Sequence, residues 1–245
     1  MWGQAAVICP SMYGLIGGIR FAGAAPDATA RITFVLVNDI YLMADELMSD
    51  GQRRGGFARL AAVVKAERAK ASVTSGHVIF AHGGDTLSPS LMSGIDHGKH
   101  IMTLTNLIPP DIFVPGNHEF DFGKATFLQR MAEAKFPLYA ANLRGPNRQP
   151  LPDFKDRSIV TVDGVRIGLT GATYDDSVRA SDPGDLRFLP TDATLNEQAE
   201  AAASRRRRFR CRRGPRHPRT GLSDLSRPRS RSPSHWPHPR SVHRV

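Results

Sequence analysis

The chain has 245 residues and a mass of 26.8 kDa, which is long enough to bury the core of one sizeable α/β domain or two small ones. Its two cysteines, Cys9 and Cys211, lie far apart and give no support to a disulfide framework or a cysteine-based zinc site. The formal charge of +10 is uneven, because residues 1–203 carry −3 and residues 204–245 carry +13. The basic character therefore says little about the partners of the main domain.

Residues 1–30 are interpreted as a poor leader or a linker. The stretch Leu15–Ala25 is weakly apolar, but Arg20 interrupts it and no cationic segment precedes it. A cleaved leader and a flexible linker fit this pattern equally well. No apolar run reaches 18 residues, so no membrane span is expected.

From residue 31 onward, short apolar runs alternate with stretches of helical spacing. The apolar runs predict strands at residues 32–37, 78–81, 111–114, 138–140, 158–162 and 165–170. The helical spacing predicts a helix from residue 57 and further helices at about 99–108, 124–134 and 193–203. Asp163-Gly164 is typical of a type I′ hairpin turn. We expect an α/β domain with a central sheet and one antiparallel element.

Polar clusters follow three of the predicted strands: Asn38-Asp39, Gly83-Gly84-Asp85-Thr86 and Gly116-Asn117-His118-Glu119. Ligands of open α/β sheets bind beyond the carboxyl ends of the strands, so the three clusters are expected to converge on one site. Their carboxylate, amide and imidazole groups suit Mn, Fe, Zn or Mg ions. One such cluster alone is more simply a turn or a helix cap, but three in register favour a functional site.

These clusters, together with the block Gly116–Gly123, resemble the calcineurin-like metallophosphoesterase superfamily in its bacterial 5′-nucleotidase and UDP-sugar hydrolase branch. The resemblance covers about residues 31–203. It implies a metallophosphoesterase-like α/β/β/α sandwich, incomplete at its C-terminal side. It also implies a phosphoester hydrolase that acts on a nucleotide or another small phosphoester with two divalent metal ions (Mn, Zn, Fe, Co or Mg). The implied location is periplasmic, with the cytoplasm as the alternative because the leader is weak.

The resemblance assigns a role to each matching residue. Asp39 would bind the first metal, Asp85 would bridge both metals and Asn117 would bind the second. His118 would be catalytic, stabilising the transition state or protonating the leaving oxygen. Tyr41 stands where the family usually has a histidine ligand, and a phenol is a weaker ligand because its pKa lies near 10. Because its position matches a ligand of the family but a phenol binds more weakly, Tyr41 is only a candidate ligand.

The family also uses three further histidines, one after the next strand and two in a Gly-His-x-His block, and residues 1–203 offer neither. The four other histidines before residue 204 are interpreted as structural or solvated: His77, His82, His97 and His100. An inactive, truncated remnant that lacks the Gly-His-x-His ligands is therefore an alternative to an active hydrolase.

Residues 204–245 hold 14 Arg, 7 Ser and 6 Pro, which predicts a disordered tail. Nonspecific nucleic-acid binding is a further alternative for this tail. Nucleic acid is not an expected partner, because only Phe209 and Trp236 are available for base stacking. Read one base later, the codons of residues 235–242 are compatible with a Gly-His-x-His block. We hypothesise that a one-base shift near codons 200–208 placed the tail out of frame.

Overall fold

The computed structural model describes residues 4–8 and 30–204 of the chain. The chain divides into two units, 1–210 and 211–245, and every described residue belongs to the first. The interpretation of residues 9–29 and the predicted disorder and frame shift of residues 205–245 lie outside the described residues.

A five-stranded parallel sheet has the strand order β2-β5-β6-β7-β9. Its strands are β2 (Ile32–Val37), β5 (His77–His82), β6 (Ile112–Phe113), β7 (Leu138–Tyr139) and β9 (Phe154–Lys155). The first four confirm the predicted strands, whereas β9 was not predicted because a two-residue strand leaves no periodicity to detect. All five strands run the same way, so their carboxyl ends share one edge of the sheet.

A second, antiparallel sheet has the order β1-β11-β10, with β1 at Gln4–Ile8, β10 at Arg157–Val162 and β11 at Val165–Ala172. The turn between β10 and β11 confirms the predicted hairpin, because Asp163 and Gly164 both have positive φ, 48° and 78°. Strand β1 lies in the segment interpreted as leader or linker, an interpretation that included no strand.

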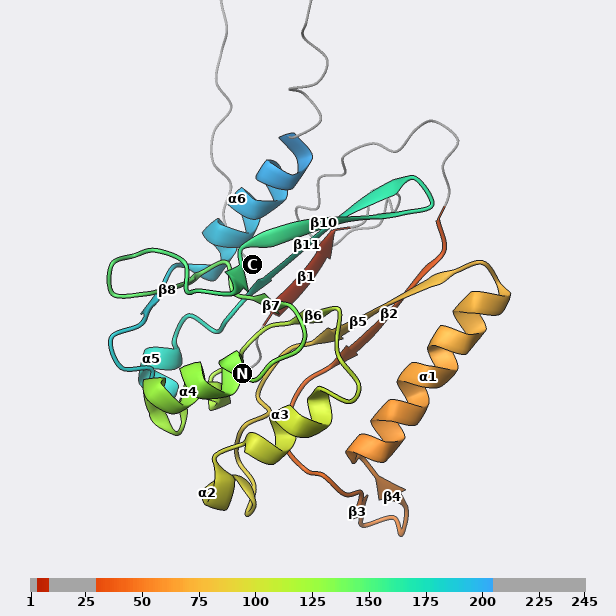
Figure 1. Cartoon of the computed structure of the whole chain (residues 1–245), viewed down its shortest axis with the longest axis horizontal. Coiled ribbons are helices and arrows are strands. Elements are labelled where there is room, and N and C mark those ends of the chain that lie inside the picture. Colours follow the sequence, from red (N-terminus) through yellow and green to blue (C-terminus); the bar gives the residue numbers. More distant parts are fainter. Residues whose placement is uncertain (1–3, 9–29, 205–245) are drawn as a thin grey trace, which may run out of the picture. The chain divides into compact units, whose positions relative to one another are not determined.

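Four layers stack from bottom to top of Figure 1. Helices α1 (Phe57–Val73), α3 (Lys99–Thr105) and α4 (Gly123–Ala132) cover the parallel sheet, which faces the antiparallel sheet, and α6 (Thr191–Ser204) packs on β10 and β11. The predicted α/β/β/α sandwich is confirmed. The remaining elements are short: α2 (Ser93–Asp96), α5 (Ser177–Ala180), a 3-10 helix (His118–Phe120), β3 (Glu46–Leu47), β4 (Arg53–Arg54), β8 (Leu143–Arg144) and β12 (Arg187–Phe188).

The core follows the two-residue alternation of the strands. Ile79 and Ala81 of β5 point between the sheets, where they belong to one buried cluster with Ile167 of β11. Phe80, between them in sequence, points the other way and packs with Leu60 of α1. This double-sided burial fixes the register of β5 and so the position of the loop that follows it.

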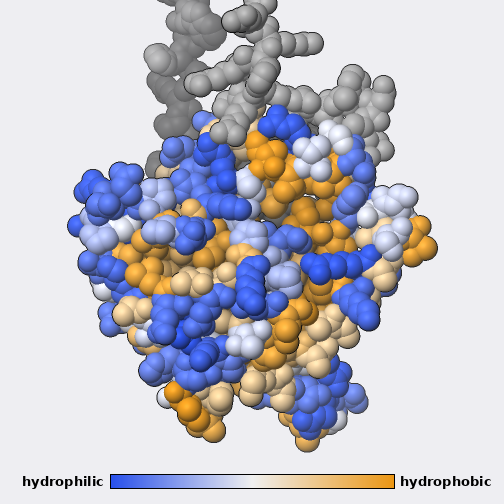
Figure 2. All heavy atoms as spheres, in the orientation of Figure 1, coloured by the Kyte–Doolittle hydropathy of each residue, from blue (hydrophilic) through white to orange (hydrophobic). Residues whose placement is uncertain are grey.

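Some large apolar side chains are left exposed, most plainly near α2. Leu91 is 90% exposed and Ile95 is 72% exposed. Figure 2 shows an apolar patch at the lower left, where α2 lies in Figure 1. Within the part of the chain that the structure describes, no helix has both the length and the apolar character needed to cross a membrane.

Candidate metal site

Three loops meet at the carboxyl edge of the parallel sheet, as the sequence predicts. We call residues 38–41, 83–88 and 115–121, which follow β2, β5 and β6, the site loops. The first two loops are tied by backbone hydrogen bonds: the Asp39 N–H donates to the Gly84 carbonyl at 3.1 Å, and the Gly83 N–H donates to the Val37 carbonyl at 2.7 Å. The Thr86 hydroxyl also donates to the Ile40 carbonyl.

Glu119 joins the second site loop to the third. Its side chain is only 1% exposed, and its two oxygens accept four backbone N–H groups. These N–H groups belong to Asp85 at 2.8 Å, Thr86 at 2.7 Å, Leu87 at 3.3 Å and Gly116 at 2.6 Å. Burial and then the charge of Asp85 raise the pKa of Glu119 to about 7, while the N–H donors act in the opposite direction.

Two glycines allow the second and third loops to touch. A Cβ on Gly84, whose φ is 78°, would lie 2.2 Å from the Gly116 nitrogen, and a Cβ on Gly116 would lie 2.1 Å from Oδ1 of Asp85. No larger residue fits at either position without moving the loop. The glycines therefore create the cradle in which the Asp85 carboxylate lies.

Asp39 and Asp85 both have left-handed backbone conformations, with φ of 57° and 53°. Aspartate and asparagine tolerate this conformation better than other residues that have a side chain. Asp39 is exposed and accepts a hydrogen bond from the Asn38 amide, whereas Asp85 is 2% exposed. Burial raises the pKa of Asp85, the hydrogen bond from the His118 backbone N–H lowers it, and the charge of Asp39 raises it further, so the net shift is upward.

His118 is oriented from two directions. Its backbone N–H donates to Oδ1 of Asp85 at 2.9 Å, and its Nδ1 lies 2.7 Å from Oδ2 of Asp121, which also accepts the Ser88 hydroxyl. Burial lowers the pKa of His118, but the hydrogen bond and charge of Asp121, with the charges of Asp85 and Glu119, raise it above its usual value. The bond to Asp121 leaves Nε2 as the ring nitrogen available to a substrate.

The other two predicted residues lie on the same loops. Asn117 is 6% exposed and directly precedes His118. Tyr41 is half-buried two residues after Asp39, and within residues 30–204 its phenol forms no hydrogen bond with another site residue. The structure thus brings Asp39, Asp85 and the backbone of His118 together. Tyr41 lies near them only because it is two residues from Asp39 in the sequence.

The donors suit a hard divalent cation, because Asp39, Asp85 and Asn117 supply only oxygen ligands. The cradle formed by Gly84 and Gly116 fixes the position of the Asp85 carboxylate. Among the described residues, no three His, Cys, Asp or Glu side chains form a group that could hold a metal. These three residues fit part of a metal site, and further ligands are needed for two ions.

The histidines interpreted as structural or solvated lie outside this donor set. Exposed His77 pairs with Asp163 at 3.2 Å, and exposed His97 stacks on Phe122 with ring centroids 4.7 Å apart. The His100 Nδ1 lies 2.7 Å from Asp96.

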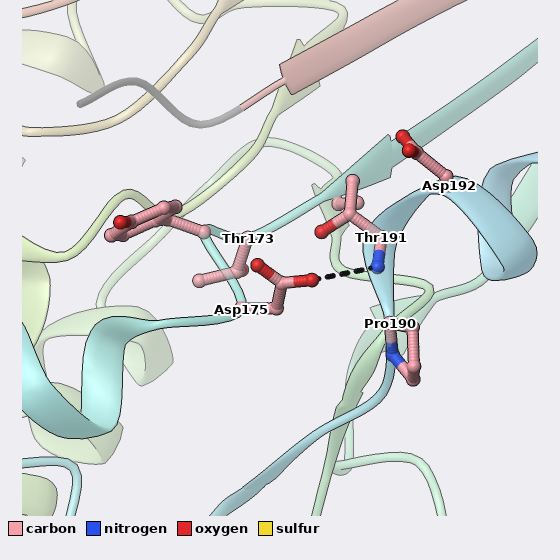
Figure 3. A pocket seen from close by; sticks show the side chains of 7 residues that line it. Thr173, Asp175, Pro190, Thr191 and Asp192 are labelled. Atoms are coloured by element: carbon pink, nitrogen blue, oxygen red, sulfur yellow. Dashed lines mark hydrogen bonds between the residues drawn. The ribbon is translucent and has the colours of Figure 1, made fainter.

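A separate pocket lies between the end of β11 and the start of α6 (Figure 3). Asp175 points to the N-terminus of α6 and accepts the Thr191 N–H at 2.9 Å. Asn142 binds both backbone groups of Thr173, its amide donating at 2.7 Å and its oxygen accepting at 2.9 Å. Asp175 thus fixes the start of α6 and Asn142 fixes the chain that follows β11, and these roles account for both side chains without a ligand.

Sequence reasoning assigned no role to Glu119, Asp121 or Ser88, which hold the site loops. One signal for Glu119 was available: a carboxylate stands in a short block rich in glycine and apolar residues, where it must be either exposed or extensively hydrogen-bonded. Ser88 carried no such signal, because its contact with Asp121 spans 33 positions of the chain.

The profile of the family described as calcineurin-like phosphoesterase matches residues 32–216. The chain belongs to this family. It is 27% identical over 193 residues to "Protein 5NUC" of Lutzomyia longipalpis, a match that covers 73% of this chain and 33% of that protein. It is 30% identical over 170 residues to a probable 5′-nucleotidase of Treponema pallidum (strain Nichols), covering 65% of this chain and 28% of that protein.

The fold is also shared with solved structures. The NAD nucleotidase of Haemophilus influenzae matches with a TM-score of 0.60 and 24% identity, over 70% of this chain and 32% of that one. A 5′-nucleotidase precursor from Thermus thermophilus matches with a TM-score of 0.60 and 23% identity, over 70% of this chain and 34% of that one. The chain thus spans about a third of the length of these relatives.

Proposed function

We propose that the chain carries the first half of a dinuclear metal site for hydrolysis of a nucleotide-type phosphoester. Asp39 is the ligand of the first ion, Asp85 bridges the two ions, Asn117 binds the second, and Tyr41 is a candidate ligand of the first. The names of the relatives, which include 5′-nucleotidases from a bacterium and from mouse, support the substrate class. We also propose a periplasmic location, with the cytoplasm as the alternative, and the relatives named snake venom 5′-nucleotidase support export.

Each residue has a defined task in this proposal. Two divalent ions, when bound, would activate a water and neutralise charge on the phosphoryl group. Asp85 accepts the His118 N–H on Oδ1, and its carboxylate would hold the ions from the cradle formed by Gly84 and Gly116. His118, with Nδ1 turned to Asp121, presents Nε2 to the phosphoester and protonates its leaving oxygen.

The convergence of the three site loops carries the proposal. Asp39, Asp85 and Asn117 come from three separate strands, and the buried Glu119 holds the second and third loops in contact through backbone groups alone. A site that only stabilised the fold would not need the carboxylates of exposed Asp39 and buried Asp85 on neighbouring loops at this edge.

Mn²⁺ titration and phosphate release from p-nitrophenyl phosphate or a nucleotide test the proposal. Asp39→Asn keeps a residue that tolerates positive φ and removes only the charge, so Mn²⁺ affinity and turnover should both fall at least about tenfold with little change in Tm. Asp153→Asn is the matched control, because Asp153 is exposed with φ of 65° at the opposite end of the sheet. Asp121→Asn should lower turnover by about tenfold or more while Mn²⁺ affinity is kept.

Equal effects of Asp39→Asn and Asp153→Asn on Mn²⁺ affinity would contradict the proposal. The inactive remnant remains the second candidate, favoured by the small donor set of the described residues. It predicts weak Mn²⁺ binding without turnover. Resequencing the DNA from about codon 195 past the stop would then show whether a Gly-His-x-His block lies in another frame.

A further inference from the structure

His82, the last residue of β5, is a buried histidine to which neither the fold nor the proposed chemistry assigns a task. Its side chain is 1% exposed and its ring lies against Phe113, with centroids 4.9 Å apart. Burial lowers its pKa to about 3, so the ring is neutral at physiological pH.

The two ring nitrogens of His82 differ in their contacts. Nδ1 accepts the Gly84 N–H at 3.1 Å, so the proton of the neutral ring resides on Nε2. Nε2 is buried and has no hydrogen-bond partner among the residues that the structure describes. A buried donor without a partner is unfavourable, and an apolar side chain would avoid that cost. The histidine is therefore not explained by core packing alone.

The Gly84 peptide connects His82 to both carboxylates of the site. The Gly84 N–H is held by His82, its carbonyl accepts the Asp39 N–H at 3.1 Å, and its chain continues directly into Asp85. The N–H belongs to the Gly83–Gly84 peptide and the carbonyl to the next peptide, so a change in the Gly84 backbone would displace both aspartates at once. Gly84 packs against Gly116 with no room for a Cβ, but no hydrogen bond joins these two glycines within the described part of the chain, so this contact alone does not orient the Gly84 backbone.

We propose that His82 is a positioning residue for the metal site: its Nδ1 holds the N–H of Gly84 and so fixes the backbone conformation of Gly84, which sets the relative position of Asp39 and Asp85. The inference rests on the proposed function in that these two aspartates bind the metal. His82 is not itself a ligand, because Nδ1 is occupied by Gly84 and Nε2 is inaccessible.

Two substitutions separate positioning from packing. His82→Asn keeps an acceptor oxygen near the place of Nδ1 but leaves a cavity beside Phe113. His82→Leu fills more of that space and removes both the acceptor and the unsatisfied donor. We expect the Leu variant to melt at the same temperature as the Asn variant or higher. We expect Mn²⁺ affinity to show the opposite order, within about threefold of wild type for Asn and weaker by about tenfold or more for Leu.

Phe113→Leu is the control, because it removes the ring that packs on His82 and keeps the Nδ1 acceptor for the Gly84 N–H. It should lower Tm and leave Mn²⁺ affinity unchanged. A purely structural role for His82 predicts that affinity follows Tm across all three variants, and that result would overturn the proposal.

Amide hydrogen exchange of Gly84 and Asp39, measured without metal, tests the positioning independently of the proposed function. Both amides should exchange slowly in the wild-type chain and faster in His82→Leu, with His82→Asn nearer to wild type. Unchanged protection of Asp39 in His82→Leu would refute the positioning role even if Mn²⁺ binds. Absence of Mn²⁺ binding by the wild-type chain, with the expected exchange pattern, would instead refute the proposed function and leave the positioning of the loops established.

Discussion

The site loops and the β3–β4 hairpin are both held by a carboxylate, but in opposite ways. Glu119 is buried and receives four backbone N–H groups from the second and third loops. Asp45, which precedes β3, lies near the surface and pairs with the guanidinium groups of Arg53 at 2.9 Å and Arg59 at 3.1 Å.

The two carboxylates differ in what they bind: Glu119 binds backbone N–H groups, whereas Asp45 binds the side chains of two arginines. Exposed ion pairs compete with water and with the entropy of long side chains, so they contribute little to stability. A buried carboxylate bound by backbone amides fixes the chain itself, and its loss leaves several donors without partners. The loops that carry the candidate ligands should therefore be rigid and intolerant of substitution, whereas the hairpin should tolerate changes of charge.

The largest effect is expected for Glu119→Gln. Glutamine has one acceptor oxygen, and its NH₂ group would face backbone N–H donors. The free energy of unfolding should fall by roughly 3–6 kcal/mol, since two hydrogen bonds to a charged group are lost at about 1.5–3 kcal/mol each. Urea unfolding at pH 8, above the pKa of about 7, measures the ionised form. Asp45→Asn is the control and should leave the unfolding curve unchanged. Equal losses of unfolding free energy in the two variants would show that burial makes no difference between the carboxylates of Glu119 and Asp45.

The next effect concerns the glycine cradle. In Gly116→Ala the new Cβ would overlap Oδ1 of Asp85, so the free energy of unfolding should fall by about 1–3 kcal/mol and Mn²⁺ affinity should drop about tenfold or more. Gly94→Ala is the matched control, because Gly94 lies in α2 with no heavy atom within 4 Å of its added Cβ. It should be neutral or stabilising by roughly 0.5–1 kcal/mol. Isothermal titration with Mn²⁺ compares the two, and wild-type affinity in Gly116→Ala would mean that Asp85 does not need this position.

The sequence was most informative where burial imposes a period on the chain. The strand predicted at residues 32–37 is β2 without change, and the predicted hairpin turn at Asp163-Gly164 has the expected pair of positive φ angles. The helix expected at about 99–108 ends at Thr105 in the structure, since Asn106 caps α3 before the two prolines are reached. Strand β9 and the pair β8–β12 were not predicted, because two residues are too few to show alternation.

The residues of the site were also predictable only where a local pattern in the sequence marks them. Asp39, Asp85 and Asn117 were identifiable because each follows a predicted strand, and parallel strands bring such residues to one edge. The partners that hold them were not identifiable, because contacts such as Ser88 with Asp121 and Glu119 with Thr86 depend on how loops fold over each other. Local patterns located the candidate ligands, and tertiary structure was needed to show what positions them.

The smallest expected effect is a pH dependence at Asp96, which joins α2 to α3. Its carboxylate accepts the backbone N–H groups of Gly98 and His100 at 3.0 and 2.8 Å and contacts the His100 ring at 2.7 Å. Burial raises the pKa of Asp96, but these hydrogen bonds outweigh burial and hold the pKa below its usual 3.8.

Because the folded-state pKa is the lower one, the ionised carboxylate stabilises the fold fully above the unfolded pKa of about 3.9 and loses this contribution as pH falls through the folded pKa. Asp96→Asn should therefore be less stable than wild type by about 1 kcal/mol at pH 6, as for loss of a helix cap. The gap in Tm should narrow as pH is lowered to about 3, where the wild-type carboxylate is being protonated. Thermal unfolding at both pH values measures the gap, and a gap that stays constant would show that Asp96 acts through packing rather than through its charge.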